Sequence, residues 1–128
     1  MREASFEIRE SASEKIRTYA LQAYPEEGCG VLLSSANGVI EDVYLMENAV
    51  PSETAARHYR IDPLQFYEIE KKAAGNGYEI AGFFHSHPDC IATPSKEDEA
   101  QMIPEMLYII TAVENGRCME MNGFIKER

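Results

Sequence analysis

The chain has 128 residues, of which 45% are hydrophobic, and its 22 acidic and 12 basic residues give a net charge of −10. This length predicts a single domain over residues 1–128 with enough chain to bury a core. The acidity argues against a nucleic-acid backbone or an anionic membrane surface as partner, because both attract basic patches. The N-terminus carries no apolar signal region, and no apolar run reaches membrane-spanning length. The cysteines are widely spaced and odd in number, which argues against a disulfide framework and favours the reducing cytoplasm.

The first part of the chain alternates between strand-like and helix-like patterns. Ser11 and Glu14 have the spacing of a capping box, and apolar residues from Ile16 onward recur at helical spacing. Asn37-Gly38 is a hairpin turn signal between two apolar segments. The predicted elements are a short strand at Phe6 and Ile8, a helix over 12–24 that Pro25 ends, a strand from Cys29 to Leu33 and a partner strand from Val39 to Met46.

The second part contains two apolar runs that predict strands buried on both faces. Hairpins mixed with helices predict an α/β or α+β fold, in which helices pack on a layered sheet. The predicted elements are a loop over 48–56, a short edge strand over 58–61 that includes His58, a helix from Asp62-Pro63 to Gly75, a buried strand over 78–85, a loop over 88–94, a short helix from Ser95 that Pro104 closes, a buried strand from Leu107 to Val113, an Asn115-Gly116 turn and a last strand around Cys118 to Met121.

Two histidines stand at the end of the first buried run, in the order His85-Ser86-His87-Pro88. Side chains alternate along a strand, so His85 and His87 are expected to point to the same face. Two imidazoles that converge in this way suit a divalent metal, zinc above all. Taken alone, a His-x-His pair is more often no more than the end of a strand.

A third metal ligand is expected nearby, and Asp98 is the candidate. Ser95 and Asp98 have the spacing of a helix N-cap and the third helical residue. Two histidines and one carboxylate would leave one of zinc's four positions open, as in catalytic zinc sites. Two alternatives stay open here. Ser95 and Asp98 could form a helix cap and nothing more, and Cys90 could compete with Asp98 as a soft ligand.

Together these residues resemble the JAMM (MPN-plus) metalloprotease family. The resemblance rests on His85-Ser86-His87-Pro88, on the ten residues between His87 and Asp98, and on Ser95 three residues before Asp98. Upstream, Glu27-Gly28-Cys29-Gly30 is similar to the family's Glu-x-Cys-Gly segment. The resemblance covers nearly the whole chain. It implies a mixed, curved β-sheet packed by helices, related to the cytidine deaminases, and one Zn²⁺ per chain held by His85, His87 and Asp98.

The resemblance also implies roles for two further residues. Glu27 would take a proton from water and give one to the leaving amine, as a general acid–base must. Glu26 is chemically identical, but neighbours on an extended chain face opposite ways; without the resemblance, both would be read as a solvated surface after a helix. Ser95 would stabilise the transition state through its hydroxyl.

The implied function is that of a zinc metallopeptidase or isopeptidase. Its substrate would be an amide bond after the C-terminal tail of a ubiquitin-like or sulfur-carrier protein. The compact chain resembles the bacterial and archaeal members of the family, some of which act on sulfur carriers.

Three other classes of protein compete with this interpretation. A nucleobase deaminase needs His-x-Glu and Cys-x-x-Cys, and the sequence contains neither. A cysteine peptidase that uses Cys29 or Cys90 with His58 would lack any local signature. A non-catalytic binding scaffold of the same fold is the main competitor. Such scaffolds typically lose the metal ligands, whereas the full set is present here, so zinc content and chelator sensitivity would separate the two.

Overall fold

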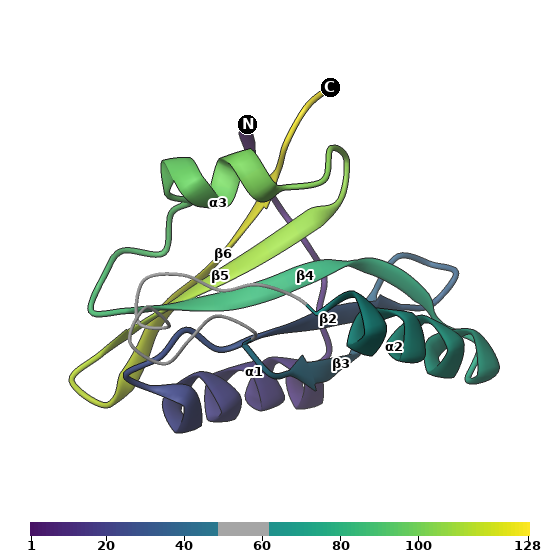
Figure 1. Ribbon diagram of the computed structural model, residues 1–128, viewed down its shortest axis with the longest axis horizontal. Helices are drawn as coiled ribbons and strands as arrows, with labels where there is room; N and C mark the ends of the chain where they lie inside the picture. The colour runs from purple at the N-terminus through teal and green to yellow at the C-terminus, as the bar shows by residue number, and fades with distance from the viewer. Residues whose placement is uncertain (49–61) are drawn as a thin grey trace.

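The structure, a computed structural model, describes residues 1–48 and 62–128, which form a six-stranded mixed sheet with helices on both faces (Figure 1). The strand order is β1-β6-β5-β4-β2-β3. Only β4 and β5 are parallel within this sheet, and its other neighbours are antiparallel. The elements are β1 (Arg2–Ala4), α1 (Glu10–Ala23), β2 (Cys29–Ser34), β3 (Ile40–Met46), α2 (Pro63–Gly75), β4 (Glu79–Pro88), α3 (Lys96–Gln101), β5 (Leu107–Glu114) and β6 (Arg117–Ile125).

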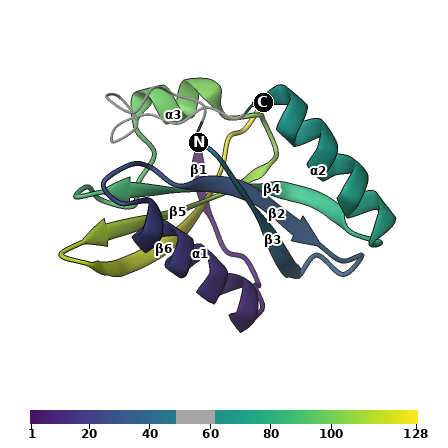
Figure 2. The same cartoon turned by 60° about the horizontal axis from the view of Figure 1, so that its bottom comes forward.

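The two faces of the sheet carry different helices. Figure 2 shows α1 below the sheet, with α2 and α3 above it. Alternation along β4 sends Phe84 into the apolar cluster on the α1 side and Phe83 into the cluster on the side of α2 and α3. Ile109 and Ile110 divide in the same way on β5. The predicted class, a mixed sheet packed by helices with central strands buried on both faces, is therefore confirmed.

The N-terminal predictions are wrong in detail. The first strand is Arg2–Ala4, whereas Ile8 makes an isolated parallel bridge to Ile40. The first helix begins two residues earlier than predicted, and its N-cap is Arg9, whose side chain makes no capping hydrogen bond within the described residues. The reason is tertiary, because the Arg9 N–H donates to the Ile40 carbonyl and holds this part of the chain against β3.

The caps of the other two helices follow the sequence signals. The Asp62 carboxylate accepts from the Leu64 N–H, with Pro63 as the first helical residue, and α2 ends at Gly75 as predicted. Ser95 and Asp98 form a reciprocal capping box at the start of α3. This last helix ends at Gln101, before Pro104 is reached.

Two strands run three or more residues past their predicted ends, and the other bounds of β2 to β6 differ by at most one residue. β4 continues to Pro88, so both histidines lie within the last four residues of the strand. β6 extends to Ile125. The predicted loop over 48–56 and the edge strand with His58 fall almost entirely outside the described residues. Within the described ranges, no helix is long and apolar enough to span a membrane.

The parallel pairing of β4 with β5 determines where α3 lies relative to the two histidines. Parallel neighbours need a crossover connection, and here that connection contains α3. The crossover returns over the end of β4, which brings the first turn of α3 back to the strand that carries the histidines.

Candidate active site

Four predicted residues from three segments meet at the end of β4. Glu27, His85, His87 and Asp98 are all buried, and each offers a ligand atom within 4.8 Å of the others. Asp98 Oδ2 lies 2.9 Å from His87 Nε2 and 3.2 Å from His85 Nε2, and the two Nε2 atoms are 3.1 Å apart. The structure thus brings together the residues that the sequence placed in one site, although Glu27 and Asp98 are far apart along the chain.

Strand register explains how Glu27 arrives there. β2 pairs antiparallel with β4, with Cys29 opposite His85. Glu27 precedes Cys29 by two residues, so it shares the face of the sheet to which His85 and His87 point. Glu27 is 4% exposed, whereas the neighbouring Glu26 is half-buried and stands outside the group of four. The solvated-surface alternative is therefore wrong for Glu27.

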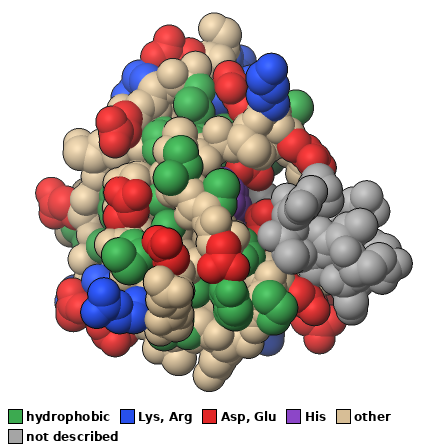
Figure 3. Space-filling view, turned by 90° about the vertical axis from the view of Figure 1, so that its left-hand side faces the viewer, with side chains coloured by type: hydrophobic (Ala, Val, Ile, Leu, Met, Phe, Trp, Pro, Cys, Tyr) green, Lys and Arg blue, Asp and Glu red, His purple; other side chains and the backbone are tan. Residues whose placement is uncertain are grey.

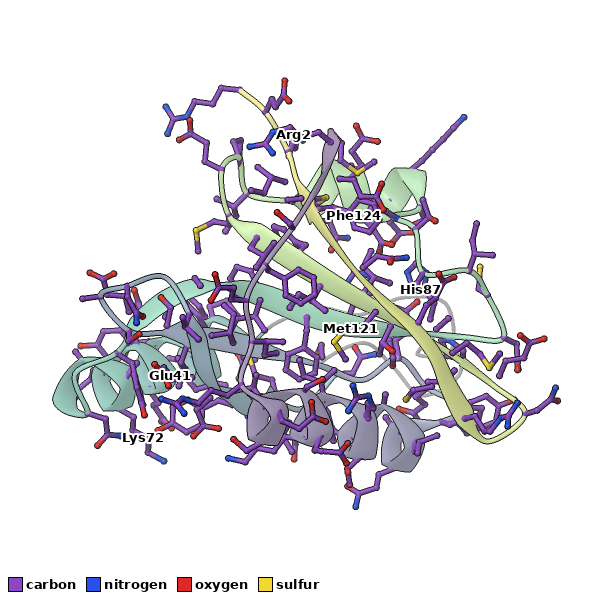
Figure 4. The ribbon with its side chains drawn as sticks, turned by 180° about the vertical axis from the view of Figure 1, so that it is seen from behind. Arg2, Glu41, Lys72, His87, Met121 and Phe124 are labelled. Carbon is purple, nitrogen blue, oxygen red and sulfur yellow. The ribbon has the colours of Figure 1, made fainter. Side chains whose placement is uncertain are left out.

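His87 is oriented by the loop that follows it. Its Nδ1 lies 2.7 Å from the Ile91 carbonyl oxygen, an acceptor, so Nδ1 carries a hydrogen, and Nε2, which faces Asp98, is the nitrogen left to bind a metal. Figure 4 shows His87 on the same side of the sheet as Phe124, and Met121 on the α1 side. The Ile91 carbonyl is a contributor that no side-chain pattern in the sequence could reveal.

Asp98 is held as a carboxylate. Burial opposes its ionisation, but hydrogen bonds from His85 and His87 outweigh burial and hold the pKa of Asp98 well below its usual range. The Ser95 N–H also donates to Oδ2, at 2.9 Å. Burial lowers the pKa of His85, which favours its neutral, ligating form. Burial also acts to lower the pKa of His87, but the contacts with Asp98 and the Ile91 carbonyl leave it raised.

The pKa of Glu27 is shifted in the opposite direction to that of Asp98. Burial raises the pKa of its carboxyl from 4.5 to about 8, and the charges of Asp98 and Glu97 act in the same direction, against His87. Its Oε1 is buried and has no hydrogen-bond partner among the described residues. A carboxyl with a free oxygen and a pKa near neutrality can both accept and release a proton.

The raised pKa predicts how the stability of the metal-free protein depends on pH. Between pH 4.5 and about 8 the folded state holds the Glu27 proton more tightly than the unfolded state, so ionisation favours unfolding. The stabilisation that the protonated Glu27 gives the folded state is complete below pH 4.5 and is lost as the pH rises through about 8. Each pKa unit is worth about 1.4 kcal/mol, so the loss is on the order of a few kcal/mol.

Glu27→Gln cannot ionise and should show a shallower fall in the free energy of unfolding between pH 5 and pH 8. Urea unfolding of both proteins in the presence of a chelator measures this difference. Parallel pH profiles would contradict the burial of an ionisable carboxyl at this position.

Two of the four residues, Glu27 and His87, line a surface cleft of about 510 Å³, whose other lining residues are Pro25, Pro88, Asp89, Cys90 and Ser95. In Figure 3 a recessed histidine is visible between apolar and acidic side chains.

Cys90 is exposed in the cleft wall and stands outside the group of four, whereas Asp98 is inside it. The geometry therefore favours Asp98 over Cys90 as third ligand. Cys29 is buried in the core, and His58 lies outside the described residues, so the cysteine-peptidase alternative gains no support.

The donor set fits zinc. Zinc binds imidazole nitrogen and carboxylate oxygen at about 2.0–2.2 Å, which places tetrahedral ligand atoms about 3.4 Å from one another. The observed separations of 2.9, 3.1 and 3.2 Å fall short of that value by about half an ångström or less. Two neutral nitrogens and one ionised oxygen would complete the protein's share of a four-coordinate site.

This chain is similar in sequence to known proteins. The family model described as prokaryotic homologs of the JAB domain matches residues 9–122. A probable TtuB-protein conjugate cleaving protease from Thermus thermophilus is 30% identical over 104 residues, which are 81% of this chain and 68% of that protein. A desampylase from Haloferax volcanii is 28% identical over 106 residues, which are 81% of this chain and 75% of that protein.

Solved structures extend the comparison to the fold. A protein from Desulfitobacterium hafniense, 28% identical, superposes with a TM-score of 0.84 over 97% of this chain and 86% of its own. A JAB1/MPN domain protein from Archaeoglobus fulgidus, 18% identical, gives a TM-score of 0.62 over 97% and 91% of the two chains, which shows a common fold.

Proposed function

This chain belongs to the family of prokaryotic JAB domains, and from that premise we propose that it is a zinc-dependent isopeptidase. Its substrate would be an amide bond that follows the C-terminal tail of a ubiquitin-like or sulfur-carrier protein. Two relatives are named as a conjugate cleaving protease and a desampylase, which supports this class of reaction. The observation that carries the proposal is the buried group of Glu27, His85, His87 and Asp98, of which Glu27 and His87 line a surface cleft.

His85, His87 and Asp98 would hold the zinc ion. When bound, zinc would make water nucleophilic at neutral pH and polarise the amide carbonyl. The Ile91 carbonyl keeps His87 in the tautomer that offers Nε2, and the Ser95 N–H keeps Asp98 turned toward both histidines.

Glu27 would move the protons. Hydrolysis of an amide requires a group that takes a proton from water and delivers one to the departing nitrogen. The free Oε1 and the raised pKa of Glu27 suit this task better than the carboxylate of Asp98, which its hydrogen-bond partners hold ionised despite its burial. Zinc binding would not need Glu27, because the other three side chains supply the ligands.

Ser95 would act at the carbonyl oxygen of the substrate. Its Oγ accepts from the Asp98 N–H at 3.0 Å, so its hydroxyl hydrogen stays available to donate into the cleft that Ser95 lines. A donor in that position stabilises the negative charge that develops in the transition state.

Ser95→Ala separates this role from simple helix capping. Loss of the cap alone costs about 1 kcal/mol of stability, whereas loss of a transition-state donor slows turnover by about 100-fold or more. We expect a folded, zinc-loaded variant with slow turnover, measured by steady-state kinetics alongside thermal unfolding. A normal rate with only a lower melting temperature would leave Ser95 as a cap.

We further propose that residues 1–128 act as one domain and work in the cytoplasm. Cys29, Cys90 and Cys118 are free thiols in the structure, which suits a reducing compartment.

Digestion of ubiquitin-like and sulfur-carrier conjugates, with and without a chelator, tests the proposed function. Cleavage that stops with chelator and returns with zinc supports it. Folded protein that binds such a carrier but neither binds zinc nor cleaves conjugates would be the non-catalytic scaffold.

A further inference from the structure

The peptide bond between Glu27 and Gly28 is hydrogen-bonded at both ends by side chains from two other segments. Its carbonyl oxygen accepts from Asn48 Nδ2 at 3.1 Å. Its N–H, that of Gly28, donates to Ser86 Oγ at 2.8 Å. The Ser86 N–H returns a hydrogen bond to the Gly28 carbonyl at 2.9 Å. Ser86 is 1% exposed, so water cannot readily take the place of its hydroxyl.

This peptide lies just before a regular strand. β2 begins at Cys29, so the ladder between β2 and β4 does not by itself fix the residue that carries the carboxyl. The Glu27 side chain adds little restraint of its own, because its buried Oε1 has no hydrogen-bond partner among the described residues. The position of the carboxyl therefore depends on how its backbone is held.

Ser86 stands between the two histidines on β4. Alternation turns its side chain to the α1 face, away from His85 and His87. On that face Gly28 packs tightly, since a Cβ at this position would stand 3.2 Å from the Ala23 Cβ. The peptide that carries Glu27 is thus tied directly to the strand that carries two proposed zinc ligands. Asn48, which follows β3, fixes the other end of the same peptide plane.

We propose that Ser86 and Asn48 are positioning residues, which hold the Glu27 carboxyl at its working distance from the zinc ligands. The inference rests on the proposed function and adds to it the device by which a residue 58 positions before His85 keeps its place. Neither residue needs to touch the substrate or the metal for this role.

Kinetics of Ser86→Ala and Asn48→Ala test the proposal in the zinc-loaded protein. A misplacement of about 1 Å can cost about 100-fold, so we expect kcat to fall by about 10- to 100-fold. KM should stay within about 3-fold and zinc content should not change, because binding groups are untouched. Ser86→Thr keeps the hydroxyl and should recover most of the rate.

Two matched controls account for the general effect of the substitutions. Ser13→Ala removes another buried serine on the α1 face, whose Oγ donates a hydrogen bond to the Met121 sulfur at 3.9 Å. Asn76→Ala removes an asparagine whose Nδ2 contacts the Tyr44 hydroxyl. Both should keep the wild-type kcat. Equal losses in the controls and in the two positioning variants would overturn the proposal.

A double-mutant comparison identifies the route of the effect. If Ser86 acts through Glu27, Ser86→Ala should cause no further loss in a protein that already carries Glu27→Gln. The same factor of loss in both backgrounds would show that Ser86 acts on something other than Glu27.

Amide hydrogen exchange provides a measurement that does not depend on activity. In Ser86→Ala the Gly28 amide should exchange at least about tenfold faster, while the amides of Val31 and Leu32 in β2 stay slow. Crystal structures of the same variant should show the Glu27 carboxyl displaced. An unmoved carboxyl and slow exchange at Gly28 would overturn the positioning role even in a protein without peptidase activity. If Ser86→Ala does not fold, the same two measurements on Asn48→Ala decide, with the exchange and position of the Glu27–Gly28 peptide as readout.

Discussion

Glu27→Gln is expected to fold, bind zinc and bind a ubiquitin-like tail, yet to turn over about 100- to 10,000-fold more slowly than the wild type. The substitution keeps the size and polarity of the side chain but removes the titratable proton. His85, His87 and Asp98 remain as ligands, so the loss should appear in kcat and not in zinc content. Single-turnover cleavage of a conjugate, together with elemental analysis, measures both quantities.

Glu26→Gln is the matched control for this prediction. Glu26 has the same chemistry but is half-buried and stands outside the group that surrounds Asp98. Its variant should have a nearly normal rate. A slow Glu26→Gln with a normal Glu27→Gln would mean that the wrong carboxylate has been assigned, and normal rates for both would remove this proton transfer from the mechanism.

His87→Ala should lose zinc and reduce activity to background. The substitution removes one of three proposed ligands. The imidazole that contacts the Ile91 carbonyl is lost with it. Outer partners of a ligand alone are worth about 10- to 100-fold in metal affinity, so removal of the ligand itself should weaken binding by at least about 100-fold. Competition with a chromogenic chelator measures the affinity, and circular dichroism checks that the variant folds.

Variants of the two competing third ligands complete this test. Cys90→Ser should keep zinc, because Cys90 is exposed in the cleft wall, whereas Asp98→Ala should lose it. Tight, stoichiometric zinc in His87→Ala would refute the assignment of the site. Loss of zinc in Cys90→Ser, with zinc retained in Asp98→Ala, would identify Cys90 as the third ligand.

The parts of this protein that its sequence determines are those governed by neighbours within a few residues. The strand period alone sends His85 and His87 to one face. The spacing of Ser95 and Asp98 is sufficient for the capping box that forms at α3, and Asp62-Pro63 likewise starts α2. These signals work because the hydrogen bonds and torsions they describe close within one turn of the chain.

Tertiary structure decides what depends on register and on distant backbone. The capping-box pattern at Ser11 and Glu14 was overridden because the Arg9 N–H pairs with the Ile40 carbonyl and starts the helix earlier. Glu27 reaches the site because Cys29 pairs with His85, a register between residues 56 positions apart. No local pattern specifies such a pairing, since it results from burial of both sheet faces at once. The same packing buries Glu27 and so raises its pKa, which no reading of residue types could supply.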